Sequence, residues 1–354
     1  ALSLKYKPAA NKYFGSSIYS PDSYYLRPYL DPAVCYDGTQ NGAWDIYTQE
    51  QYPTFEGWNK ISQDRLQDNN PDNDLTPDQA KRIFEYQHRR QGDITKPDYV
   101  LDASFGGPVP YISELLGNLR FYGSYRNLRE MFVVPLSRDS YDKNVTNLKI
   151  TSDITDRMQL TLNARYGETY STSPYNWTTT PTGSVLRSDY SVASSVTSEV
   201  LFVPAYYSPT TIYRTQIGGK LNHILTDRSY YEFKVQYDKN YYHTFQMSLR
   251  DTSKNVDIWP GEAEYLMDEQ PYGYWGYGVG SIGDNIRLGG WQNIGRDSSF
   301  IHTTNIKFDY VNQLNSNNQF KTGIDMVVNN FNVKSFASNP GMETWNREQK
   351  YNVT

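Results

Sequence analysis

Hydrophobic and polar residues alternate with a period of two along residues 301–335. Before a polar turn at 314–318, one side of an extended chain carries Thr304, Ile306, Phe308 and Tyr310, and the other side carries Thr303, Asn305, Lys307 and Asp309. After the turn, Phe320, Ile324, Met326 and Val328 oppose Lys321, Gly323, Asp325 and Asn329. Each arm predicts a strand of about 10 residues, whereas soluble strands usually have about 5–6 and a tilted membrane-crossing strand needs about 9–11.

The same hairpin pattern recurs upstream. It is found at residues 98–125, 145–167 and 213–241. In the second and third hairpins, Leu160, Leu162, Phe233 and Val235 fall on the apolar side, and Arg165 and Lys234 on the polar side. The turns ITDR, LTDR and LNSN are alike and are rich in Asp, Asn and Ser, which bond their own backbone in tight turns.

The connections between these strands alternate in length. Short turns are predicted at 107–118, 153–157, 225–229 and 314–318, and long segments at 1–96, 128–144, 168–212 and 246–300. Every second connection of an up-and-down antiparallel sheet lies at the same edge, and this asymmetry is typical of outer-membrane barrels. The pattern predicts an all-β fold, part of an antiparallel up-and-down transmembrane β-barrel with long extracellular loops and short periplasmic turns. The alternative is a soluble β-protein whose apolar face packs on a second sheet.

Two regions are expected on this basis. Residues 1–96 form an extracellular loop region, and residues 97–354 carry the barrel strands with their long loops. A helix is predicted over 77–91, because Thr76 suits an N-cap, Pro77 the first turn, and Gln79 completes a capping box. Basic residues at 88–90 and a glycine at 92 mark its end. A shorter helix is expected near 56–66.

Composition favours strands over membrane helices. The mean hydropathy is −0.73, yet aromatic residues make up 15% of the 354 residues, and the sequence has no run of 18 apolar residues. A net charge of −5 argues against a nucleic-acid partner. The lone Cys35 excludes an internal disulfide framework. The chain opens at Ala1 without a signal peptide and ends in mid-pattern, so we expect it to be an excerpt of a longer protein.

The segment DASFGGPVPYISELLGNLRFYGSYR at 102–126 consists of a strand, a Gly-Gly-Pro turn and an aromatic strand. In this order of elements it resembles the barrels of TonB-dependent outer-membrane receptors of the Bacteroidetes type. The TDR-type turns and DSSFIHTTNIKFDY at 297–310 are similar too, so the resemblance spans residues 97–335.

This resemblance implies a function in ligand uptake at the bacterial outer membrane. The family has a 22-stranded barrel around an N-terminal plug that couples to the TonB system. It implies the lipid bilayer as a partner, a small-molecule, oligosaccharide or peptide ligand, and a surface lipoprotein as a further candidate partner. The plug is missing from this sequence, which shows about eight of the strands. The alternative function is a secreted soluble β-protein that binds or processes carbohydrate.

Catalytic motifs are sparse, and we expect no enzyme. The four histidines His88, His223, His243 and His302 lack metal-ligand spacing. The glycine pattern GVGSIG at 278–283 has no strand–helix unit around it, which favours a loop. Carboxylates are numerous, but the sequence alone does not bring any two together as a glycosidase pair.

One acidic run is a candidate calcium site. Asp68, Asn70, Asp72 and Asp74 place oxygen ligands at every second position, as in a calcium loop. Glycine is absent at the sixth place, and Gln79 stands at the twelfth instead of glutamate. A solvated acidic turn before the next helix is the alternative, and no other cofactor is expected.

An aromatic segment in the 246–300 loop is the candidate ligand-binding site. It reads QPYGYWGYG at 270–278, with Tyr272, Tyr274, Trp275 and Tyr277. Aromatic rings among glycines suit stacking on sugar or ring ligands. A loop packed on its neighbours is the alternative.

Overall fold

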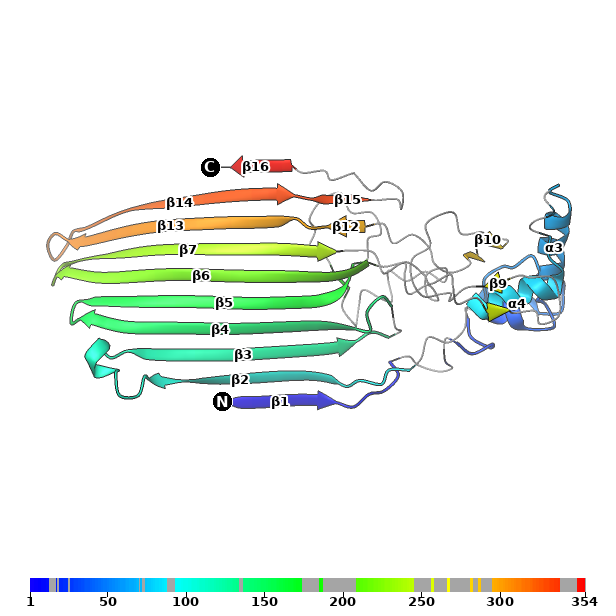
Figure 1. Cartoon of the computed structure of the whole chain (residues 1–354), viewed down its shortest axis with the longest axis horizontal. Helices are drawn as coiled ribbons and strands as arrows, with labels where there is room; N and C mark the ends of the chain where they lie inside the picture. The colour runs from blue at the N-terminus through cyan, green and yellow to red at the C-terminus, as the bar shows by residue number, and fades with distance from the viewer. Residues whose placement is uncertain are drawn as a thin grey trace.

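A large antiparallel sheet dominates the computed structural model (Figure 1). The structure describes residues 1–12, 17, 19–24, 26–69, 71, 74–87, 93–133, 136–173, 185–186, 208–244, 256–257, 266–267, 281–282, 286–287, 295–337 and 349–353. The order of the main strands in the sheet follows their order in the chain, and neighbours are antiparallel. The up-and-down antiparallel topology predicted from the sequence is therefore confirmed.

The long strands are β2 to β7, β13 and β14. Their bounds are β2 (Asp98–Pro108), β3 (Arg120–Met131), β4 (Ser140–Thr155), β5 (Met158–Ser173), β6 (Ser208–Thr226), β7 (Ser229–Thr244), β13 (Phe300–Gln313) and β14 (Gln319–Val333). The outermost strands of this order are β1 (Leu2–Lys7) and β16 (Gln349–Val353), and the short strands β12 (Gly295–Asp297) and β15 (Ser335–Ala337) pair beside β7. Two further short pairs join β8 (Val256–Asp257) to β9 (Leu266–Met267) and β10 (Ser281–Ile282) to β11 (Ile286–Arg287). Closure of the sheet into a barrel stays a prediction.

Tight turns occur where the sequence predicts them, but the bonding residue differs at two of them. Thr155 Oγ1 accepts a hydrogen bond from the Arg157 amide, and Thr226 Oγ1 accepts one from the Arg228 amide. Threonine rather than aspartate therefore makes the local bond in the TDR turns. At the third turn Asn315 Oδ1 accepts the amide of residue 318 at 2.9 Å, as expected for asparagine.

The strands extend further toward the loops than the sequence predicts. The connection predicted at 128–144 is only 132–139, because β3 and β4 continue through polar residues. The connection predicted at 168–212 begins after Ser173 and ends before Ser208. In these extensions polar residues occur on both faces, and the few apolar ones, such as Met131 and Ile212, do not alternate with them, so the pattern that predicts strands is absent there.

The helices lie in the N-terminal part of the chain. They are α1 (Arg27–Leu30), α2 (Ile46–Gln51), α3 (Trp58–Leu66) and α4 (Pro77–Gln87), and a 3-10 turn η2 (Glu114–Leu116) lies between β2 and β3. Thr76 and Gln79 form the predicted capping box, with reciprocal bonds of 2.8 and 3.2 Å. Residues 88–92, where the helix was predicted to end, lie outside the described residues. Within the described residues, no helix has both the length and the apolar character needed to cross a bilayer.

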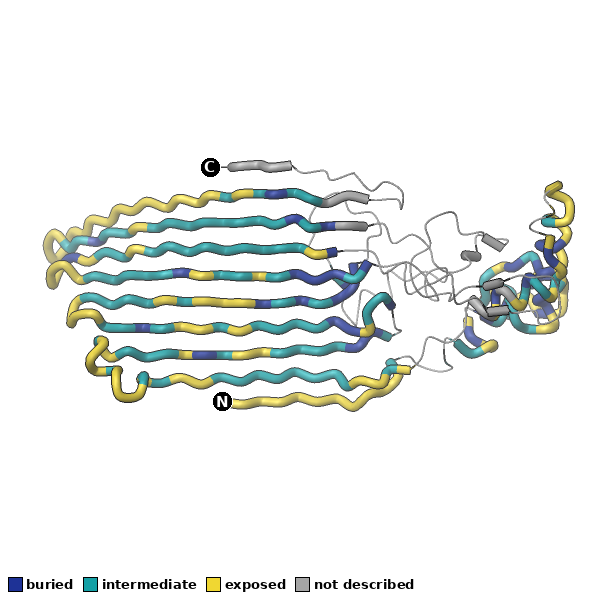
Figure 2. The backbone as a smooth tube through the Cα atoms, viewed as in Figure 1, coloured by how far each residue is buried: buried dark blue, intermediate teal, exposed yellow. Residues whose placement is uncertain are grey.

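An aromatic cluster forms the core of this helical region. Tyr29 contacts Phe55 and Phe84 with ring centroids 4.7 Å apart, and Trp58 is fully buried between Phe55 and Phe84. Dark blue stretches mark the buried residues there in Figure 2, whereas the long strands are mostly intermediate or exposed. The region 1–96 also contributes β1 to the sheet, where Leu4 pairs with Leu101, so its first strand does not belong to a loop.

Candidate functional site

The strand register places apolar residues of neighbouring strands side by side on one surface, which we call the apolar face. Its central row consists of Leu162, Gly219, Val235, Ile306 and Met326, one from each of five neighbouring strands. The row nearer the turns holds Leu160, Leu221, Phe233, Phe308 and Ile324, and the row nearer the loops holds Ala164, Ile217, Tyr237, Thr304 and Val328. The division into two faces predicted from the sequence is thus confirmed.

The apolar face is not covered by the part of the chain that the structure describes. Ile324 is 71% exposed, Ile217 is 56% exposed and Leu162 is 46% exposed. Large apolar side chains exposed over so many adjoining strands mark a surface that meets lipid or another protein.

Rings and histidines border the apolar face at both ends. On the turn side, His223 Nδ1 lies 3.2 Å from the Tyr231 hydroxyl, and Tyr231 packs against Phe308. On the loop side, the Tyr237 hydroxyl lies 2.8 Å from His302 Nδ1. Counted with its two border rows, from Tyr231 to Lys239 on β7, the apolar face spans nine residues of a strand, close to the ~9–11 that a tilted membrane strand needs. Aromatic rings at both borders of an apolar band are typical of membrane β-strands.

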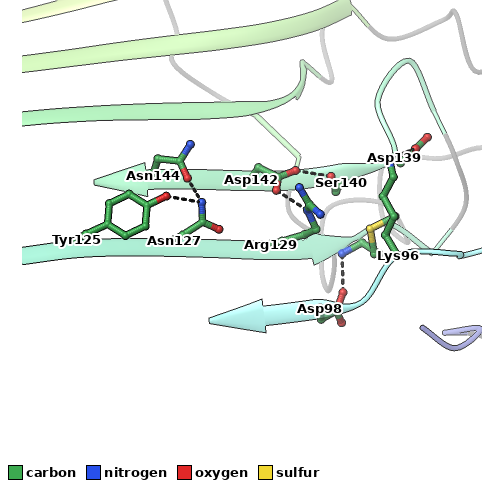
Figure 3. A network of polar contacts seen from close by, with 10 residues as sticks. Lys96, Asp98, Tyr125, Asn127, Arg129, Asp139, Ser140, Asp142 and Asn144 are labelled. Atoms are coloured by element: carbon green, nitrogen blue, oxygen red, sulfur yellow. Dashed lines mark hydrogen bonds and ion pairs between the residues drawn. The ribbon is translucent and has the colours of Figure 1, made fainter. Parts of the chain in front are cut away.

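Beyond the loop-side border, the side chains of the same face become charged and hydrogen-bonded (Figure 3). Arg129 Nε donates to Asp142 Oδ1 at 2.7 Å, and Ser140 donates to the other oxygen of Asp142. Asn127 bonds to Asn144 on the neighbouring strand. The apolar face therefore ends on the turn side of this network.

The opposite surface, which we call the polar face, carries charges in direct register. Lys220, Lys234 and Lys307 are neighbours on β6, β7 and β13. Lys220 pairs with Glu232 at 2.5 Å and Lys307 with Asp309 at 3.3 Å. Like charges directly opposite each other destabilise a sheet in isolation, so this face requires water or a polar partner against it.

The polar face is also hollowed. A depression of about 750 Å³ is lined by Asp102, Ser124, Arg126, Asn147 and Arg165 among others, and one of about 450 Å³ adjoins Glu232, Asp309 and Lys321. These residues alternate with the apolar ones along the same strands. A sheet with depressions on its polar side and exposed apolar residues on the other side is the arrangement expected of a barrel wall around a wet or filled interior.

Three titratable groups outside the long strands have pKa values shifted by burial or by a local hydrogen bond. Burial raises the pKa of the Cys35 thiol, which keeps it protonated inside the aromatic cluster. The Tyr36 hydroxyl donates to Asp78 at 2.7 Å, and this bond raises the pKa of Tyr36 to about 12. Burial lowers the pKa of the Arg138 guanidinium in the 132–139 connection, where it lies over the Tyr170 ring.

The predicted site residues are only partly within the described chain. Tyr272, Tyr274, Trp275 and Tyr277 lie outside the described residues, as do Asn70 and Asp72. Among the described residues no cluster of three His, Cys, Asp or Glu side chains could hold a metal. Gln79, at the twelfth place of the candidate calcium loop, uses its side-chain oxygen in the capping box. The calcium and ligand sites stay predictions.

Comparisons with known proteins give limited similarity. No protein-family model and no curated protein matches the chain. The chain resembles a solved structure of Pseudomonas aeruginosa FpvA bound to a heterologous pyoverdine–iron complex, with a TM-score of 0.40 and 11% identity over 68% of this chain and 27% of the other. A second structure, the outer-membrane ferripyoverdine receptor of the same organism, gives a TM-score of 0.39 and 12% identity over 71% and 28%. The chain thus spans little more than a quarter of the length of these receptors. A TM-score near 0.4 does not establish a shared fold. The evidence for the antiparallel sheet is therefore the pairing of the strands within this chain.

Proposed function

We propose that this chain is a segment of a bacterial outer-membrane receptor barrel of the TonB-dependent type, acting in ligand uptake. The observation that carries the proposal is the continuous apolar face, which the register extends over β5, β6, β7, β13 and β14 between two aromatic borders. A bilayer satisfies such a surface without any further protein layer, and the polar face can then enclose water or a plug.

The distribution of connections supports the same proposal. Figure 1 shows the hairpin turns of β4–β5, β6–β7 and β13–β14 at one end of the sheet, and the helices beyond the other end. Outer-membrane barrels have short turns on the periplasmic side and long loops outside the cell. We therefore assign helix α4 and the connections 174–207 and 245–294 to the cell exterior.

The ligand would be captured by the long loops. Tyr272, Tyr274, Trp275 and Tyr277 supply the flat apolar area that a sugar or ring ligand needs, and a small molecule, an oligosaccharide and a peptide remain the candidate classes. One aromatic contact is worth about 0.5–1.5 kcal/mol, so Trp275→Ala should weaken uptake several-fold to about tenfold at unchanged receptor abundance. A fall in folded receptor with unchanged uptake per molecule would instead make Trp275 a packing residue.

The partners follow from the same proposal. Energy coupling to the TonB system would require a plug, and a surface lipoprotein is a candidate partner at the loop end. Transport, rather than catalysis, is the proposed activity.

The location is tested by fractionation and proteolysis of cells that make the full-length protein. The protein should fractionate with outer membranes and require detergent for extraction. Protease added to intact cells should cut within the 174–207 and 245–294 connections and spare the turn at 314–318. Recovery in the soluble secreted fraction would instead support a carbohydrate-binding β-protein, and cleavage confined to the short turns would reverse the topology.

A further inference from the structure

Lys239 differs from the other charged residues on the apolar side of the sheet. Alternation along β2–β7, β13 and β14 places four charged side chains on that side: Arg129, Asp142, Glu168 and Lys239. Arg129 and Asp142 pair with each other at 2.7 Å. Glu168 accepts hydrogen bonds from the Tyr166 and Tyr170 hydroxyls at 2.6 and 2.7 Å. Within the described residues, Lys239 makes no ion pair.

The position of Lys239 is the loop-side border of the apolar face. The register places it directly between Thr215 and His302, two residues along β7 from Tyr237. Its Nζ lies 5.6 Å from the centre of the Phe300 ring, and the residue is half-buried. A lysine at such a border lays its methylene stem along apolar surface and holds its ammonium group at the level of lipid headgroups.

The neighbouring histidine has an unmet hydrogen-bonding group at the same place. The Tyr237 hydroxyl lies 2.8 Å from His302 Nδ1, and when this hydroxyl donates, Nε2 carries the ring hydrogen. His302 Nε2 is buried and has no hydrogen-bond partner among the described residues. In the described part of the chain, the ammonium group of Lys239, which has no counter-ion, and the ring N–H of His302, which has no acceptor, therefore belong to residues directly opposite each other on β7 and β13. Both are complementary to an anion.

We propose that Lys239, with Tyr237 and His302 beside it, binds the phosphate headgroup of an anionic lipid in the leaflet at the loop end of the barrel. This inference rests on the proposed membrane location. The occupant is a lipid rather than a free anion because the cation lies at the edge of an exposed apolar face, where acyl chains would cover Ile217 and the rows below it. Phosphate supplies both the negative charge for the ammonium group and acceptor oxygens for the ring.

The test counts anionic lipid on the purified full-length protein. Protein is exchanged into mixed micelles of phosphatidylglycerol and phosphatidylcholine, and retained lipid is measured by native mass spectrometry. Lys239→Gln should lower the retained phosphatidylglycerol about fivefold, which is the effect of one lysine near an anionic surface. Lys239→Arg should retain as much phosphatidylglycerol as the wild-type protein, because arginine keeps the positive charge. Lys234→Gln is the matched control, because this lysine lies on the same strand but on the polar face, and it should leave lipid retention unchanged.

Each other outcome overturns the proposal. Equal retention in Lys239→Gln and wild type, or an equal loss in Lys234→Gln, would show that no specific site exists. Displacement of the lipid by inorganic phosphate at equal concentration would show an anion site without a lipid requirement. A wild-type protein that is absent from membranes refutes the proposed function itself, a result visible before any lipid is counted.

Discussion

Replacing Leu162 by arginine should destabilise the protein by about 2–4 kcal/mol, the cost of a cation on the lipid side near the bilayer midplane. Leu162 occupies the central row of the apolar face, with one further row between it and the border on each side. Its side chain is 46% exposed in the sheet. In water, a substitution at so exposed a site usually changes stability by no more than about 0.5 kcal/mol, so the two environments give clearly different results.

The assay is guanidinium unfolding of the full-length protein from phospholipid vesicles. Asn305→Arg is the control, because Asn305 lies on the polar face. Its direct neighbours across the strands are Gln236 and Val327, so the new arginine has no like charge directly opposite it. We expect the control to stay within about 0.5 kcal/mol of wild type. A Leu162→Arg penalty no larger than that of Asn305→Arg would refute the assignment of the apolar face to lipid.

Three further predictions concern the turns and the helical region. Gly117→Ala should lower the free energy of unfolding by at least about 1–3 kcal/mol, because Gly117 has φ of 65° and a Cβ there would lie 2.0 Å from the Asp153 carbonyl oxygen. Thermal unfolding measures this loss, and unchanged stability would exclude the close approach. Thr76→Ala should destabilise α4 by about 1 kcal/mol, seen as faster amide exchange in its first turn, whereas exchange equal to wild type would mean that the cap contributes nothing. Because the pKa of Tyr36 is raised to about 12 from 10.0, its bond to Asp78 stabilises the helical region fully below pH 10 and less as the pH rises through 12. Limited proteolysis should show this loss in wild type and not in Tyr36→Phe; the same pH response in both would contradict it.

The hairpins could be predicted from sequence because one face of each strand is apolar. Alternation at residues such as Phe308 and Val235 has a period of two, which fixes both the strand and the face of every side chain. Register adds what the sequence alone does not contain: Leu162, Val235 and Ile306 become one row only when the four strands β5, β6, β7 and β13 are aligned.

The loop-side part of the sheet was missed because polar residues occur on both faces of its strands, without a regular alternation with apolar ones. Arg129 and Asp142 were predicted to lie in a loop, but they pair across β3 and β4 at 2.7 Å. Their strand conformation is supported by cross-strand bonds between residues far apart in sequence, a tertiary signal without local periodicity. Lys239 was overlooked for a similar reason, since its significance lies in its position beside His302 on the next strand.

The helical region shows the same limit. The capping box at Thr76 is local and was predicted correctly. The aromatic cluster joins Tyr29, Phe55 and Phe84, which are widely spaced in the chain, so no pattern within one segment marks it.

The most direct test of the membrane assignment compares two adjacent residues of β13 in the full-length protein in vesicles. Spin labels are attached at Ile306→Cys and Lys307→Cys, and their collision rates with oxygen and with a water-soluble nickel chelate are measured. Ile306 lies in the central row of the apolar face and Lys307 on the polar face, so the label at 306 should meet oxygen and be shielded from nickel, while the label at 307 should be less accessible to oxygen. Nickel access at 306, or low access of both reagents there, would contradict contact with lipid and indicate a face that meets water or a second protein layer.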